Sequence, residues 1–364
     1  MSVISTFLQK IRKISSYKHR RMLRIYEDKK LYDKYGNTDI IKLSTNDLRL
    51  INKLWGKHIN RCKINYKWFE LYHSLWPEQN AADFVPDSFY YAYVDNIINN
   101  HQKASILDDK NLYDLYFPGI MMPRTLFRII NGVYMNEHYQ VIILDEVLDI
   151  CKSQEQIVLK PSVYSVGGKG ILFWSKNYDS MDALKEYLQN NNDIICQAII
   201  IQHEELSKLH PNSVNSIRIL TAFIDNEVEV VSSIIRIGVN KSNVDNTSSG
   251  GLSCGLNNKG ELNNFAFDIK GRRYLVHPQG ARFENSKVPN FDKCVELVKS
   301  LSPRFYGVSR LISWDLSINP DGEPILVEVN LSGGGINFHQ MNNGPVLKKY
   351  INYFLNLTNN YYEN

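Results

Sequence analysis

Residues 314–330 read WDLSINPDGEPILVEVN, and no other segment says as much about the architecture of this chain. Two apolar runs flank a turn at Asn319–Gly322, which predicts a β-hairpin. One residue separates Glu328 from Asn330, so on a strand both side chains point to the same face. The hairpin brings Asp315 alongside them. Two carboxylates and an amide oxygen predict a Mg²⁺ site rather than a zinc site; the alternative is a solvated hairpin with an accidental acidic pair.

The composition is that of a globular protein with more than one module. The chain has 364 residues, of which 43% are hydrophobic and 22% charged, and this length favours two or three modules. A net charge of +4 argues against a protein that binds nucleic acid or another polyanion as a whole. The five cysteines are scattered and form no CxxC pair, which favours a reducing cytoplasm. Apolar runs are too short for a transmembrane helix, and we expect no signal peptide.

Three segments differ in pattern, and together they predict an α+β protein. Residues 1–104 are helical and rich in aromatic residues, which we expect to form a core. This module begins with a basic amphipathic helix over about residues 1–35. We favour a helix that docks on the protein and leaves its charged face in solvent over one that lies on an anionic membrane. Residues 105–200 and 201–364 alternate short strands and helices, as α/β modules do. Expected strands are 141–144, 156–160, 170–174, 193–201, 216–225 and 227–239, and expected helices are 182–190 and 291–301.

A glycine-rich segment between two expected strands predicts a flexible flap. Lys160 closes one strand, and a short glycine-rich run precedes the next. That run consists of Gly167, Gly168, Lys169 and Gly170. Glycines let backbone N–H groups approach phosphates closely, and the two lysines add positive charge. The segment is not a Walker A loop, because no helix beginning with Lys-Ser or Lys-Thr follows it.

Two arginines and a loop form a second group of candidate residues. Arg218 interrupts an apolar strand, and an unpaired buried charge is costly. We favour a phosphate or carboxylate ligand as its partner over a salt bridge to a nearby Asp or Glu. Arg236 and the loop 244–251, which contains Asn246, supply further polar groups that can meet a substrate.

These residues together resemble the ATP-grasp superfamily. In that superfamily the lysine of an Asp-Lys pair and the lysine of a strand-ending Lys-Pro hold ATP phosphates, beneath a glycine-rich flap. A hinge strand then presents backbone groups to adenine, and an acidic residue beyond it holds the ribose. By this resemblance the ATP-binding residues are Lys110, Lys160, Gly167, Gly168, Lys169, Gly170, Gln197, Ala198, Ile199 and Glu204, and the metal ligands are Asp315, Glu328 and Asn330.

Within the superfamily, several stretches are similar to the sugar-transfer-associated ATP-grasp group, which accompanies the biosynthesis of bacterial surface polysaccharides. The stretches are Gln202-His203, residues 213–218, residues 244–246, Gly250-Gly251 and Trp314-Asp315. One departure is Gln197, which stands where the family has a hinge glutamate for the adenine amino group. The resemblance spans about residues 105–345, and it implies an ATP-grasp fold of two α/β modules that clasp ATP.

The resemblance also implies an ATP- and Mg²⁺-dependent carboxylate–amine ligase that forms an amide through an acyl phosphate. Arg218 would stabilise the transferring group, and Arg236 and Asn246 would orient the acceptor. We expect a sugar acid such as a uronic acid of a capsule or other surface polysaccharide, an amino acid as the amine, and a cytoplasmic location near the inner membrane. The alternatives are an ATP-grasp phosphotransferase that acts on a sugar, and a non-catalytic protein that binds a membrane or a polyanion through the basic helix.

Overall fold

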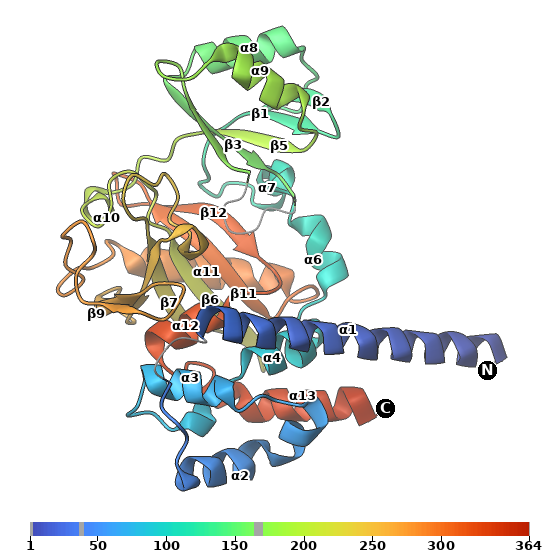
Figure 1. Ribbon diagram of the computed structural model, residues 1–364. Coiled ribbons are helices and arrows are strands. Elements are labelled where there is room, and N and C mark those ends of the chain that lie inside the picture. The colour runs from blue at the N-terminus through green and yellow to red at the C-terminus, as the bar shows by residue number, and fades with distance from the viewer. Residues whose placement is uncertain (1–2, 36–39, 164–169, 364) are drawn as a thin grey trace. The chain divides into compact units, whose positions relative to one another are not determined.

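The computed structural model describes residues 3–35, 40–163 and 170–363, and it divides into two compact units. One unit comprises Met1–Asn100, Lys270–Arg272 and Ser332–Asn364, and the other comprises His101–Ile269 and Arg273–Leu331. The first unit is helical, whereas the second carries two antiparallel sheets with helices against them (Figure 1). The expected α+β class and helical N-terminal module are therefore confirmed. The module boundaries expected after residues 104 and 200 stay predictions.

Short and long helices make up the first unit. They are α1 (Val3–Tyr35), α2 (Thr45–Cys62), α3 (Lys67–Leu75), η1 (Ala81–Asp83), α4 (Asp87–Phe89), the π-helix η2 (Tyr90–Val94), α5 (Asp95–Ile98), α12 (Ile336–Asn343), η6 (Lys348–Tyr350) and α13 (Ile351–Glu363). Helix α2 begins where Ser44 and Asp47 each accept the other's backbone N–H, a capping box. Within the described parts of the chain, no helix is both long and apolar enough to cross a bilayer.

Aromatic side chains fill the centre of the helical unit, as the sequence predicts. Trp55 is fully buried between Phe69 and Phe89, whose ring centroids lie 5.7 and 5.3 Å away in edge-on geometry. Its indole N–H donates to the carbonyl of Ala82 at 2.8 Å. A ring with both its faces and its polar atom satisfied inside the protein is a core residue and is closed to stacking by a ligand.

The smaller sheet has five strands in the order β2-β1-β5-β3-β4. Its strands are β1 (Thr125–Ile130), β2 (Val133–Asn136), β3 (Gln156–Pro161), β4 (Leu172–Ser175) and β5 (Ile194–Ala198), and it shares a core with helices α8 (Leu144–Lys152) and α9 (Met181–Gln189). The prediction of a strand over 141–144 is wrong, because only Val141 forms a bridge and α8 begins at Leu144. The predicted strand 193–201 ends early, at Ala198.

The larger sheet has seven strands in the order β10-β9-β8-β7-β6-β11-β12. Its strands are β6 (Ile217–Ile224), β7 (Glu227–Ile237), β8 (Leu252–Leu256), β9 (Leu262–Phe267), β10 (Arg273–Tyr274), β11 (Leu311–Ile318) and β12 (Pro324–Asn330). The same unit contains α6 (His101–Leu107), η3 (Lys110–Leu112), α7 (Tyr113–Tyr116), α10 (Glu204–Ser207), η4 (Thr247–Ser249), α11 (Phe291–Leu301) and η5 (Ser302–Phe305). The predicted hairpin is confirmed, since β11 and β12 pair antiparallel across a turn in which Gly322 has a φ of +81°.

Candidate active site

Asp315 lies at the centre of the polar cluster on the larger sheet. On β11 it is paired with Arg218 of β6 on one side and with Glu328 of β12 on the other. Residues directly paired across strands have side chains on the same face. Asn330 follows Glu328 by two residues and so shares this face. The three residues expected to bind a metal therefore lie on neighbouring strands next to Arg218.

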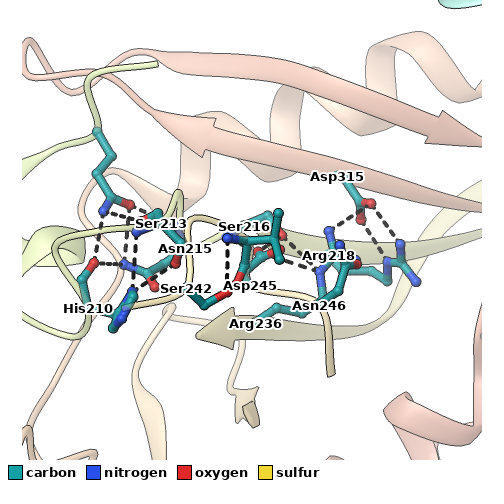
Figure 2. A network of polar contacts seen from close by, with 12 residues as sticks. His210, Ser213, Asn215, Ser216, Arg218, Arg236, Ser242, Asp245, Asn246 and Asp315 are labelled. Atoms are coloured by element: carbon teal, nitrogen blue, oxygen red, sulfur yellow. Dashed lines mark hydrogen bonds and ion pairs between the residues drawn. The ribbon is translucent and has the colours of Figure 1, made fainter. Parts of the chain in front are cut away.

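Two arginines hold the Asp315 carboxylate (Figure 2). Arg218 donates to both carboxylate oxygens, from Nε and from Nη2, at 2.7 Å each, and Arg236 adds a bond from Nη2 at 3.1 Å. The Asp315 side chain is fully buried, and burial alone would raise its pKa. Arg218 and Arg236 overcome that effect and hold the pKa of Asp315 at about 2. Arg218 thus forms the salt bridge that was the less favoured alternative, and each guanidinium still offers more N–H donors than these contacts use.

Arg236 is fixed in place by the segment before β6 and by the loop after β7. Its Nε donates to Ser216 Oγ at 2.8 Å, and its Nη1 donates to Asn246 Oδ1 at 3.2 Å. The Ser216 backbone N–H and hydroxyl both donate to Asp245 Oδ2, the first at 2.8 Å. Asp245 therefore orients Arg236 through Ser216. The sequence reasoning missed both residues, although Asp245 precedes Asn246 in the loop that it singled out.

A second, buried part of the network holds the chain that leads into β6 (Figure 2). His210 lies 2.9 Å from Ser213 Oγ through Nδ1 and 3.0 Å from the carbonyl of Asn240 through Nε2. His277 Nε2 lies 2.8 Å from the carbonyl of Gly238, and burial lowers the pKa of this imidazole. His203 accepts the backbone N–H of Glu205 at the start of α10. All three histidines in this region contact backbone groups and so serve the architecture.

Two lysines approach the cluster from the part of the unit that holds the smaller sheet. Lys110 Nζ is 2.9 Å from Glu328 Oε1, in a salt bridge that leaves the Glu328 side chain 28% exposed. Lys160 Nζ, at the end of β3, donates to Gln197 Oε1 at 3.1 Å. Burial and repulsion by Lys110 outweigh the attraction of Glu328 and lower the pKa of Lys160 to about 8. Both lysines expected at the ATP phosphates thus lie near one metal-ligand candidate.

Arg128, which the sequence reasoning overlooked, fixes the turn that carries Lys110. It is 1% exposed on β1, and its Nε donates to the carbonyl of Asn111 at 3.0 Å. Its Nη1 donates to the carbonyl of Glu137 at 2.8 Å, and its Nη2 donates to Asp114 Oδ2 at 2.5 Å. The Lys110 backbone N–H donates to the carbonyl of Ser162, next to β3. Arg128 interrupts an apolar strand just as Arg218 does. A single arginine in an apolar run is therefore the sequence signal that could have identified it.

The remaining residues expected to contact ATP occupy several separate positions. Gln197 and Ala198 end β5, and Ile199 follows that strand. The Gln197 amide bonds to Lys160 and to the carbonyl of Pro123, so its side chain is engaged inside the protein. Glu204 is the exposed first residue of α10. Gly170 has a φ of +77°, whereas Gly167, Gly168 and Lys169 lie outside the described residues.

The donor set of this cluster fits Mg²⁺. All three candidate ligands offer hard oxygen atoms, and among the described residues no group of three His, Cys, Asp or Glu forms a competing metal site. The Asn330 amide donates towards Asp315 and to the carbonyl of Ser313 at 3.4 Å. Turning that amide over replaces its N–H with a carbonyl oxygen, since both orientations fit the same volume. With Asp315 and Glu328, which are paired across β11 and β12, Asn330 would then complete a set of oxygen donors on neighbouring strands.

One comparison with known proteins identifies the family. A family model described as sugar-transfer associated ATP-grasp matches residues 91–355. No curated protein matches the chain. Among solved structures, it is similar to a D-cycloserine synthetase (12% identity, 71% of this chain and 73% of that chain, TM-score 0.42). It is also similar to D-alanyl-alanine synthetase A from Vibrio cholerae (10%, 71% and 66%, 0.43) and to D-alanine–D-alanine ligase from Bacillus anthracis (12%, 72% and 72%, 0.39).

Proposed function

Because this chain belongs to the sugar-transfer associated ATP-grasp family, we propose that it is an ATP- and Mg²⁺-dependent ligase that joins a carboxylate to an amine. The observation that carries the proposal is the convergence of three cations, Lys110, Arg218 and Arg236, on the carboxylates Asp315 and Glu328. Cations beside paired carboxylates suit a ligand that brings both a metal ion and several phosphate charges.

Each group of residues has a proposed role in binding ATP. Lys110 and Lys160 contact the phosphates, together with the flap Gly167, Gly168, Lys169 and Gly170; Gln197, Ala198 and Ile199 receive the adenine, and Glu204 receives the ribose. Asp315, Glu328 and Asn330 would hold Mg²⁺, which would supply positive charge to offset that of the ATP phosphates.

The proposed reaction has two steps. In the first, a carboxylate oxygen of the acid attacks the γ-phosphorus of ATP, ADP leaves, and an acyl phosphate forms. In the second, the nitrogen of the amine attacks the acyl carbon, the C–O bond to phosphate breaks, and phosphate leaves as the amine loses a proton to solvent. Arg218 stabilises the charge on the transferring phosphoryl group, and Arg236 and Asn246 orient the acid. Positioning and charge stabilisation supply the catalysis, so no protein nucleophile is required.

We further propose that the acid is a sugar acid, such as a uronic acid of a capsule or other surface polysaccharide, and that the amine is an amino acid. The support for this choice is the description of the family as sugar-transfer associated. The reaction would take place in the cytoplasm, at or near the inner membrane surface. Its five cysteines, all within the described residues, are buried and free, which supports a reducing compartment.

The test is phosphate release from Mg-ATP in the presence of a panel of uronic-acid sugars and amino acids, with mass analysis of the products. Glu328→Gln is the control variant, because its partly exposed side chain can lose its charge with little effect on folding. We expect phosphate release that requires both substrates, an amide product, and loss of both in the variant. A phosphorylated sugar without an amide would replace the ligase by a phosphotransferase. Absence of Mg-ATP binding by the wild-type protein would overturn the assignment of the site.

A further inference from the structure

The outward face of α1 exposes an unusual number of large apolar and aromatic side chains. In the part of α1 whose side chains the structure describes, five of them are about half exposed or more. They are Tyr17 (61%), Met22 (62%), Ile25 (48%), Tyr26 (57%) and Tyr32 (48%). Apolar side chains scattered singly on a surface need no explanation, but several on one helix face mark a contact surface.

Residues on an adjoining face of the same helix hold α1 on its own unit. Leu31, Tyr35 and Glu27 are buried, and α1 packs against α4 and η2 (Figure 1). Asp28 accepts the indole N–H of Trp68 at 3.0 Å and an N–H of Arg24 at 2.9 Å. The exposed residues therefore lie on a helix that is packed against its own unit, and they remain exposed although that helix is held in place.

The exposed apolar side chains are mixed with basic ones. A helix turns by about 100° per residue, so the five apolar residues span an arc of about 180°. Lys18, Arg21 and Lys29 fall within the same arc and are exposed, and Asp33 is the one exposed acidic residue there. We call these nine side chains the α1 face.

The charge of the chain is also concentrated at this end. Residues 1–35 contain ten Lys and Arg and three Asp and Glu, a net charge of +7. The whole chain carries +4, so the other 329 residues carry −3. A long basic helix on an otherwise slightly acidic protein favours a partner with negative charge and orients the protein as it approaches that partner.

We propose that the α1 face docks on the surface of an anionic lipid bilayer. Met22 and Ile25 enter the boundary between headgroups and acyl chains, and the tyrosines lie at headgroup depth, where amphipathic rings are favoured. Lys18, Arg21 and Lys29 pair with anionic headgroups. A second copy of the chain fits this face less well, because like charges would meet. A nucleic acid would use the cations but would leave Met22 and Ile25 in water.

The test is sedimentation of the full chain with vesicles of phosphatidylcholine alone and with vesicles of an equal mixture of phosphatidylcholine and phosphatidylglycerol. We expect binding to the anionic vesicles only, weakened by salt. Each basic residue near such a surface contributes about 1 kcal/mol, so Lys18→Gln/Arg21→Gln/Lys29→Gln should weaken binding by about 100-fold. Met22→Ser/Ile25→Ser should also weaken it, by about tenfold or more.

Matched controls distinguish the α1 face from surface charge and surface apolarity in general. Lys53→Gln/Lys185→Gln/Lys259→Gln removes three exposed lysines elsewhere, and Val141→Ser/Ile143→Ser removes two exposed apolar residues of the other unit. Both should bind vesicles as the wild-type protein does. Equal binding to neutral vesicles, or wild-type binding by both α1 variants, would overturn the proposal.

Two further results would name a different partner and so overturn it as well. One is a dimer, detected by light scattering, that the α1 variants abolish while vesicles are ignored. The other is binding to single-stranded RNA that the serine variant leaves unchanged, with no binding to vesicles. None of these outcomes depends on ATP turnover, so the proposal and the proposed ligase function can fail separately.

Discussion

Arg128 should control the affinity for nucleotide although it lies away from the metal-ligand candidates. Its guanidinium holds the turn of Lys110 by donating to the carbonyl of Asn111, and it stacks on the ring of Tyr139 at 4.1 Å. The Asn111 side chain in turn donates to the carbonyl of Ile129 on β1, at 3.1 Å. These contacts hold the Lys110 backbone beside β3. They therefore fix the point from which its ammonium group extends.

The magnitude follows from the bonds that a substitution removes. Arg128→Ala deletes a buried cation bonded to a carboxylate and to three backbone carbonyls. Removing one partner of such a buried group costs about 3–5 kcal/mol of unfolding free energy. A displaced Lys110 would lose a charge-assisted contact to phosphate worth about 1.5–3 kcal/mol, which corresponds to about 10- to 100-fold weaker binding of MgADP. Arg128→Lys keeps the charge but not the planar fork, so an intermediate loss is expected.

Isothermal titration of MgADP, together with urea unfolding, measures both effects. Arg273→Lys is the matched control, because Arg273 also stacks on an aromatic ring, that of Phe265 at 3.7 Å, but belongs to β10. Its affinity for MgADP should equal that of the wild-type protein. If Arg128→Ala is destabilised yet binds MgADP like the wild-type protein where both are folded, Arg128 only supports the fold and the reasoning about Lys110 is wrong.

Three more predictions concern the cluster itself. Asp315→Asn should lower the unfolding free energy by about 3–5 kcal/mol, because two arginines lose their partner, whereas Glu328→Gln should cost about 1 kcal/mol or less; equal losses in urea titrations would contradict this. Burial lowers the pKa of Lys160 to about 8, so MgADP affinity should be constant below about pH 8 and fall about tenfold per pH unit above it, as its ammonium form is lost. Lys160→Arg should remove that dependence. Gly251→Ala places a methyl group against backbone carbonyls of its own loop. It should raise KM for the acid by about tenfold and leave MgADP binding unchanged. The control is Gly56→Ala, which has open space in α2 and should leave the unfolding free energy unchanged or raise it by about 1 kcal/mol.

Local patterns were sufficient to predict much of the fold. The helix over Phe291–Leu301 has the predicted bounds, because its apolar positions recur at helical spacing. The strands predicted over 216–225 and 227–239 correspond to β6 and β7, which pair antiparallel; Asp225 and Asn226 between them both have positive φ, as a tight hairpin turn requires. The strand predicted over 141–144 fails for an equally local reason. Glu146 accepts the backbone N–H of Ile143, and this cap starts a helix inside an apolar run.

The site was less predictable, because it depends on pairing between distant strands. The sequence identified Asp315 and Arg218 separately, and only the register of β6 and β11 makes them partners. Asp245 and Ser216 are 29 residues apart and meet through two hydrogen bonds, which no periodicity in the sequence indicates. Arg128 shows a different limit. A single cation in an apolar strand has the same local signature whether it faces a ligand or holds a turn.

The ion pairs of Asp315 are better explained by function than by stability. Taking a carboxylate and two guanidinium groups out of water is costly, and well-packed apolar residues of similar size often stabilise a fold as well or better. Held by Asp315, Arg218 and Arg236 keep fixed positions with further N–H donors at hand. Arginines that are already oriented need no reorganisation when an anion arrives, which is what makes fixed charges effective in catalysis. Asp315 therefore orients Arg218 and Arg236 in addition to its proposed role as a ligand of Mg²⁺.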